Sequence, residues 1–226
     1  MKAEFDAILF DAGGVFVIPD PEVLAPTLAY YGAARDHDLY HRAHYGAMAA
    51  KSRAGVPEDD WSHYNERYVE LVGVEADNRE AATYVLQRTR HAHLWRAPIS
   101  GSAQVLRELN RRGTPIGVVS NASGQIAEIL QRSGICQTGE GSLASVRCII
   151  DSHVVGVAKP DPRIFDFALV HFPDIDRSRI AYVGDSVVMD VQGARAGGFT
   201  PILVDPYDDA ADLVDCRRIG SLQELL

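Results

Sequence analysis

Short apolar runs that end abruptly in a polar or small residue punctuate the chain. Within each run the residues do not alternate between apolar and polar, which is typical of strands buried on both faces of a parallel sheet. We therefore predict strands over residues 7–10, 116–119, 148–150, 180–183 and 201–204.

Between these strands, apolar residues recur at spacings of three and four, the period of an amphipathic helix. Gly113 and Gly134 stand where the first two of these segments end, as helix-terminating glycines do. Strands that alternate with helices predict an α/β fold, a doubly wound parallel sheet with a Rossmann-like core. The predicted helices cover residues 102–112, 125–133, 162–172 and 187–196.

Residues 21–95 interrupt this alternation, because their apolar positions keep a helical spacing and include no convincing buried strand. We predict an inserted α-helical cap domain over residues 19–97, and a core built from residues 1–18 and 98–226. The polar stretch 137–147, which contains glycine and serine, is predicted to be a surface loop.

Three histidines of the insertion, His37, His41 and His44, have the spacing of a single helix face. No metal-binding motif such as His-Glu-x-x-His accompanies them. We therefore interpret this face as exposed to solvent; the alternative is that some of these histidines face the substrate together with Tyr40, Arg42 or Tyr45.

The composition narrows the possible partners. A chain of 226 residues with 46% hydrophobic content buries enough surface to fold without disulfides or a structural metal. Its net charge of −9 disfavours nucleic acid and anionic membranes, since both are bound mainly through Lys and Arg. No apolar run approaches the ~18 residues needed to span a bilayer, and the N-terminal residues do not resemble a secretion signal. We predict a soluble cytoplasmic protein that binds neither nucleic acid nor membrane; the sequence carries no signal of its oligomeric state.

Polar residues suited to binding a metal or a phosphoryl group follow several predicted strands. Asp11 ends the first, Ser120 and Asn121 follow the second, and Asp185 ends the fourth, while Lys159 precedes a predicted helix. Ligands of open parallel sheets bind beyond the carboxyl ends of the strands. Carboxylates together with a lysine suit Mg²⁺ and the oxygens of a phosphoryl group. This edge of the sheet is therefore the candidate site.

Four motifs around these residues resemble those of the haloacid dehalogenase-like hydrolase superfamily, in the order in which that superfamily carries them. Each is weak alone, but together they span nearly the whole chain. They are residues 8–15 (ILFDAGGV), 118–122 (VVSNA), 159–165 (KPDPRIF) and 183–198, the last with Gly184, Asp185 and Asp190.

The resemblance implies a phosphatase that acts on a small phosphorylated metabolite. Asp11 would attack phosphorus and form an aspartyl-phosphate, which divides one difficult displacement into two. Ser120, Asn121 and Lys159 would hold the phosphoryl oxygens, with Ser120 and Lys159 also assisting catalysis.

The resemblance also implies a Mg²⁺ cofactor. Its ligands would come from the carboxylates of Asp11 and Asp185 and from the backbone carbonyl of Gly13. Asp190 is assigned to the same metal site, either supporting the ligands or orienting Lys159.

One position departs from the phosphatase pattern. Phosphatases of the superfamily usually carry a second Asp, the general acid and base, two residues after the nucleophile, where this chain has Gly13. General acid catalysis is worth roughly 10²–10⁴ in rate, so we expect a slow enzyme or a substitute donor, for which a cap His or Tyr is the first candidate.

Two alternatives stay open because of Gly13. The haloacid dehalogenases of the superfamily also lack that Asp, so the same Asp11 could attack carbon. A catalytically weak binding protein of the same fold is the other alternative. Asp185 together with Asp190 favours the metal-dependent phosphatase.

Overall fold

The computed structural model describes residues 4–89 and 92–226. In this part of the chain six parallel strands form one sheet, in the order β10-β9-β8-β1-β4-β7. Each predicted strand is present, and the α/β fold is confirmed. Of the strands in this sheet, only β10 was not predicted, because its sequence Arg-Arg-Ile lacks an apolar run. The bounds are β1 Ala7–Phe10, β4 Ile116–Ser120, β7 Ile149–Asp151, β8 Ile180–Gly184, β9 Thr200–Val204 and β10 Arg217–Ile219.

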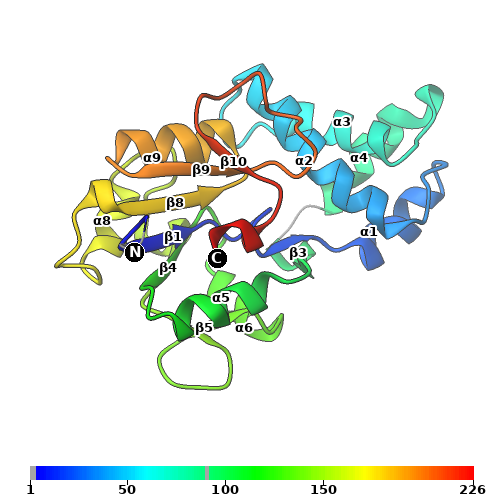
Figure 1. Cartoon of the computed structure of the whole chain (residues 1–226). Coiled ribbons are helices and arrows are strands. Elements are labelled where there is room, and N and C mark those ends of the chain that lie inside the picture. Colours follow the sequence, from blue (N-terminus) through cyan, green and yellow to red (C-terminus); the bar gives the residue numbers. More distant parts are fainter. Residues whose placement is uncertain (1–3, 90–91) are drawn as a thin grey trace.

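Helices cover both faces of the sheet (Figure 1). In β1, Ile8 and Phe10 join the hydrophobic cluster that includes α5 and α6. The alternate residues Ala7 and Leu9 pack with α8 and α9 on the other face. This alternation explains why the strand reads as continuously apolar. The helices are α5 Ser102–Arg111, α6 Ile126–Arg132, α8 Ile164–Leu169 and α9 Gly193–Ala196.

Two of the predicted helices differ in detail from the structure. The segment predicted over residues 162–172 is regular only over α8. The segment over residues 187–196 begins as a π-helix, η4 (Val187–Gln192), and continues as α9. Single π-helical turns are frequent at functional sites, and this one carries Asp190.

The helical insertion, residues 19–97, packs around a hydrophobic cluster of its own, in which Tyr40, Tyr68 and Leu28 are fully buried. Figure 1 shows its helices grouped at one side of the molecule. A short antiparallel pair of strands, β2 and β3, joins the insertion to the sheet, and the predicted domain boundaries fall within this pair. The elements are β2 Val17–Pro19, α1 Pro21–Ala29, α2 His37–Ala54, α3 Ser62–Leu71, η1 Ala76–Asn78, α4 Arg79–Thr89, η2 Ala92–Leu94 and β3 Trp95–Pro98.

The surface loop predicted over residues 137–147 is wrong at its ends. Strands β5 (Cys136–Thr138) and β6 (Ala144–Val146) pair in parallel, and the tip between them, residues 139–142, is exposed. Ala144 and Val146 are buried while Ser145 between them is exposed. A strand of three residues carries too short an alternation to be recognised from sequence.

The remaining short elements are α7 Ser152–Val155, η3 Arg177–Arg179 and η5 Leu222–Leu225. Among the helices of the described ranges, none combines the length and the apolar character required to cross a membrane.

Candidate active site

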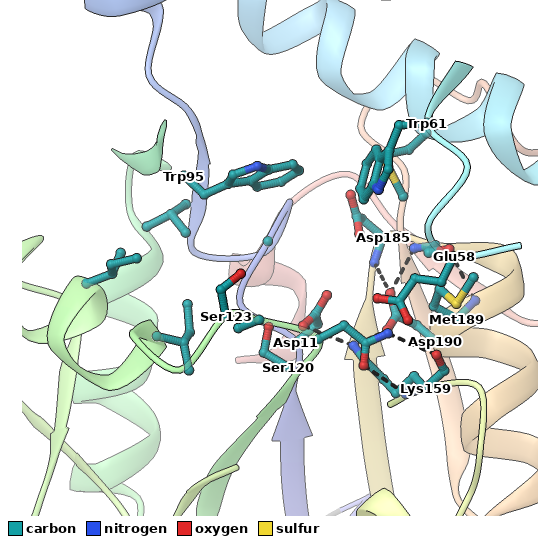
Figure 2. Close-up of a pocket in the computed structure, with 18 of the residues that line it drawn as sticks. Asp11, Glu58, Trp61, Trp95, Ser120, Ser123, Lys159, Asp185, Met189 and Asp190 are labelled. Atoms are coloured by element: carbon teal, nitrogen blue, oxygen red, sulfur yellow. Dashed lines mark hydrogen bonds and ion pairs between the residues drawn. The ribbon is translucent and has the colours of Figure 1, made fainter. Parts of the chain in front are cut away.

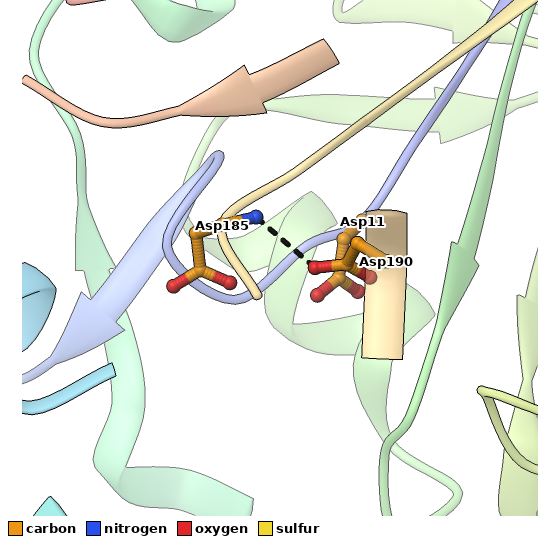
Figure 3. A group of neighbouring side chains, drawn as sticks. All are labelled: Asp11, Asp185 and Asp190. Carbon is orange, nitrogen blue, oxygen red and sulfur yellow. Dashed lines mark hydrogen bonds between the residues drawn. The ribbon is translucent and has the colours of Figure 1, made fainter. Parts of the chain in front are cut away.

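The strand order brings the predicted carboxylates together. From β1 the chain first builds the sheet outward through β4 and β7, and then returns to place β8 on the opposite side of β1. The point where the order reverses leaves a crevice between the ends of neighbouring strands. Asp11 follows β1 and Asp185 follows β8, so both side chains reach this crevice. Figure 3 shows them beside Asp190, with ligand oxygens within 4.8 Å of one another.

Lys159 lies at the centre of this cluster and is 1% exposed. Its Nζ is 3.0 Å from Asp11 Oδ1 and 2.6 Å from Asp190 Oδ1. It also donates a hydrogen bond of 2.8 Å to the hydroxyl of Tyr182. Burial lowers the pKa of Lys159, but Asp11 and Asp190 outweigh that effect and raise it above its usual value. The lysine is therefore a permanently charged group that faces the predicted nucleophile.

Asp190 has partners on both of its carboxylate oxygens. Oδ1 accepts from Lys159, and Oδ2 accepts from the backbone N–H groups of Asp185 at 3.0 Å and Ser186 at 2.9 Å. The side chain thus holds Lys159 and the turn after β8 in place. The structure puts it near the predicted metal ligands, but in a position that supports them.

Asn121 is bound to the main chain of Lys159 in both directions. Its Nδ2 donates to the carbonyl of Lys159 at 2.9 Å, and its Oδ1 accepts from the N–H of Lys159 at 2.8 Å. Because Oδ1 is engaged, the side chain ties the end of β4 to the lysine segment. Ser120 is buried at the end of β4.

The buried carboxylates carry an excess of negative charge. Burial raises the pKa of Asp11 to about 7, with Asp190 and Asp185 adding to the rise and Lys159 opposing it. Burial, followed by the charge of Asp190, also raises the pKa of Asp185 well above its usual range. Lys159 compensates one of these charges. A hard cation held by oxygens of Asp11 and Asp185 would stabilise both in their ionised form, and the donor chemistry fits Mg²⁺.

A cavity of about 320 Å³ opens above this cluster. Asp11, Ser120 and Lys159 lie at its floor, and aromatic and charged side chains of the insertion and of β3 cover it (Figure 2). The covering residues were not identified from the sequence; they include Lys51, Glu58, Trp61 and Trp95.

Comparison with known proteins decides the family. The model of the haloacid dehalogenase-like hydrolases matches residues 5–198. The chain belongs to this family.

Named relatives of this hydrolase include both phosphatases and dehalogenases. A phosphoserine phosphatase from Thermus thermophilus is 32% identical over 169 residues, which are 72% of this chain and 61% of that protein. An (S)-2-haloacid dehalogenase from a Pseudomonas species is 34% identical over 129 residues, 57% of this chain and 50% of that protein. A solved HAD phosphatase from Thermococcus onnurineus has a TM-score of 0.60 at 20% identity, over 97% of this chain and 95% of that one. The chain spans about half the length of several curated relatives that it matches.

In this haloacid dehalogenase-like hydrolase, Trp95 occupies the space beside Gly13. A Cβ atom at position 13 would lie 3.1 Å from the indole ring, which is closer than ordinary contact. The neighbouring Gly14 is constrained in another way, because its φ is +64° and a Cβ there would lie 2.0 Å from Asp185 Oδ2. The indole ring of Trp95 therefore lies where the side chain of the usual second Asp would extend.

The prediction that the histidine face of the insertion is exposed is wrong for His44. The side chain is fully buried, with Nε2 at 2.9 Å from Asp185 Oδ2 and Nδ1 at 2.9 Å from the hydroxyl of Tyr64. His37 on the same helix is half-exposed. His44 shares the helical phase of the buried residues Tyr40 and Lys51, but a lysine at this phase gives no sequence signal that the face is buried.

Proposed function

We propose that this hydrolase cleaves a small phosphate ester in the presence of Mg²⁺, through an aspartyl-phosphate on Asp11. The observation that carries the proposal is the buried cluster of Asp11, Asp185 and Asp190 around Lys159. An anionic phosphate could not enter a site with this excess of negative charge unless a cation balanced it. Mg²⁺, when bound, would supply that charge to the carboxylates and the phosphoryl oxygens.

The chain's own residues would divide the work as follows. A carboxylate oxygen of Asp11 attacks phosphorus, and Lys159 and Ser120 hold phosphoryl oxygens as their charge develops. Asp190 fixes the Nζ of Lys159, and Asn121 fixes its main chain, so both are positioning residues. Asp185 and the carbonyl of Gly13 are the remaining candidates for holding the metal with Asp11.

Dehalogenation is the second candidate, and a specific observation supports it. A haloacid dehalogenase is among the relatives. Position 13 of this chain is Gly, so it provides no proton donor next to Asp11, and dehalogenation needs none there. Attack on carbon with loss of halide requires no proton on the leaving group. Dehalogenation does not, however, explain why Asp185 is buried beside Asp190 and Asp11.

A panel of phosphorylated metabolites and 2-haloacids, assayed with Mg²⁺ and with EDTA, tests the proposal. We expect turnover of phosphate esters that EDTA abolishes, because the uncompensated carboxylates would exclude the substrate. Asp11→Asn should reduce turnover by at least about 10³-fold, since the amide cannot form the covalent intermediate.

Asp212→Asn serves as the control. It removes one negative charge, as Asp11→Asn does, but from an exposed residue that is distant from Asp11 in the sequence. Halide release in EDTA would support the dehalogenase instead. No turnover of any compound, with an intact fold, would support a binding protein.

A further inference from the structure

Glu58 reaches the active-site cavity from the segment between α2 and α3. Figure 2 shows its side chain directed from the insertion toward the cluster of Asp11, Lys159 and Asp190. Among the described residues that line the cavity there is no histidine and no tyrosine, so the donor types first expected from the sequence do not face the substrate. Glu58 is the carboxyl group that the insertion contributes.

The segment that carries Glu58 is held in place by defined contacts. Lys51 is a buried residue of α2, and its Nζ donates a hydrogen bond to the backbone carbonyl of Glu58. The same Nζ lies 3.9 Å from the ring centre of Trp61, a favourable cation–π position. Asn121 of the core lines the same cavity. The segment is therefore anchored to α2, which keeps the Glu58 carboxyl group at the cavity, as a group that acts on a bound substrate must be.

We propose that Glu58 is the general acid and base of this hydrolase, in place of the carboxyl group that Gly13 lacks. The inference rests on the proposed phosphatase function. In the first step Asp11 forms a bond to phosphorus while the bond from phosphorus to the leaving oxygen breaks. The protonated Glu58 carboxyl gives its proton to that oxygen, so the alcohol leaves neutral and Glu58 becomes a carboxylate.

The second step restores both residues. Water attacks the phosphorus of the aspartyl-phosphate and its proton passes to the Glu58 carboxylate. The bond between phosphorus and Asp11 breaks, inorganic phosphate leaves, and Asp11 and Glu58 return to their starting states. The sum is one ester and one water converted to one alcohol and one phosphate, with no further reactant.

The surroundings of Glu58 suit this exchange. Burial raises the pKa of its carboxyl above the usual range, helped by the charge of Asp190. The polar side chain of Asn121 and the charges of Lys159 and Lys51 act in the opposite direction, but burial prevails. A donor works best when its pKa approaches the working pH.

The test is the dependence of kcat/KM on the leaving group, from nitrophenyl to simple alkyl phosphates. Wild-type enzyme should show a shallow dependence, because the leaving oxygen is protonated as it departs. Glu58→Gln should lose roughly 10²–10⁴-fold with alkyl phosphates and less than about tenfold with nitrophenyl phosphate. It should also release a burst of nitrophenol and accumulate phosphorylated Asp11, since the second step has lost its base.

Asp59→Asn is the matched control, because it removes a carboxylate from the adjacent, exposed position. A purely structural role of Glu58 would lower all rates together and produce no burst. An equally shallow dependence in Glu58→Gln, or unchanged turnover, would overturn the inference. Failure of the proposed function is distinct, since the wild type would then hydrolyse no phosphate ester, or Asp11→Asn would remain active.

Discussion

Position 13 shows how one absent side chain changes its neighbourhood. In a phosphatase of the usual pattern a carboxyl group would stand here, whereas this chain places the ring of Trp95 beside a bare backbone. The φ of Gly13 is not in the left-handed region, so the obstacle to a side chain is contact with the indole and not backbone strain. Placing the usual Asp at position 13 therefore also requires that space be made beside the indole ring of Trp95.

We expect Gly13→Asp alone to change the hydrolysis of alkyl phosphates little, because its Cβ would lie 3.1 Å from the Trp95 ring. In combination with Trp95→Ala, the new carboxyl has space to reach the leaving group. In a Glu58→Gln background, which lacks the general acid proposed above, the double variant should then exceed Gly13→Asp by at least about tenfold in kcat/KM, within the range of general acid catalysis. Trp95→Ala alone is the control, and a single variant as active as the double one would contradict the explanation.

Asp190 shows how strongly a buried positioning residue can couple function to stability. It is 1% exposed and accepts from Lys159 and from two backbone N–H groups. Removing it leaves these buried donors without their acceptor.

Asp190→Ala should lower the free energy of unfolding by about 3–5 kcal/mol, the cost of breaking a buried ion pair. Urea denaturation at neutral pH measures this change. Asp212→Ala is the comparison, because its exposed ion pair with Arg53 should contribute at most about 1 kcal/mol. Equal losses in the two variants would refute the assigned role of Asp190.

Helix α2 connects the insertion to the active site along its whole length. His44 contacts Asp185, and the hydroxyl of Tyr45 donates to the carbonyl of Gly14 at 2.8 Å. Farther along the helix, Lys51 holds the segment of Glu58. The helix starts at a capping Asp36 and ends at Gly55 in the left-handed conformation, so both ends are well defined. Its buried face therefore determines how the insertion meets Asp185 and Gly14 at the proposed metal site.

His44→Ala should raise the Mg²⁺ concentration for half-maximal activity by about 10–100-fold. Residues that orient a metal ligand through a hydrogen bond have effects of this size, and His44 orients Asp185. Titration of activity with Mg²⁺ measures the shift. His37→Ala changes the same residue type at a half-exposed site of the same helix and should leave the curve in place. An unchanged curve in His44→Ala would show that the contact does not position the ligand.

Part of the negative charge of the molecule is buried, where water screens it only weakly. The net charge is −9, and Asp11, Asp185 and Asp190 are buried together at the end of the sheet. Repulsion among desolvated carboxylates opposes folding, so a bound cation should stabilise the native state.

Mg²⁺ at a hundredfold excess over its Kd should add about 2.7 kcal/mol to stability. For a chain of this length that corresponds to roughly 5–10 °C in Tm. Thermal unfolding with MgCl₂, compared with NaCl at equal ionic strength, separates binding from screening. Asp185→Asn should remove the increment, and a Tm that does not respond to Mg²⁺ in the wild type would contradict the metal site.

The sheet and the floor of the site could be predicted because they depend on local patterns. The buried strand that ends at Asp11 is a run of apolar residues, and a polar residue at its carboxyl end faces the ligand in any parallel sheet. Asp190 was found only through its motif, because its contact with Lys159 joins residues far apart in the chain. The roof was not predicted, since Glu58 lies in an irregular segment with no periodicity to interpret.

By itself, the sequence determined the α/β class, the helical insertion and the family, because apolar periodicity and motif order are properties of contiguous residues. Tertiary structure alone decided that His44 is buried against Asp185, that Trp95 lies in the space beside Gly13 and that Glu58 lines the same cavity as Asp11. Each of these contacts joins the insertion, or the β2–β3 pair at its base, to the sheet. Their geometry depends on how two separately packed hydrophobic clusters meet, and no local pattern encodes that.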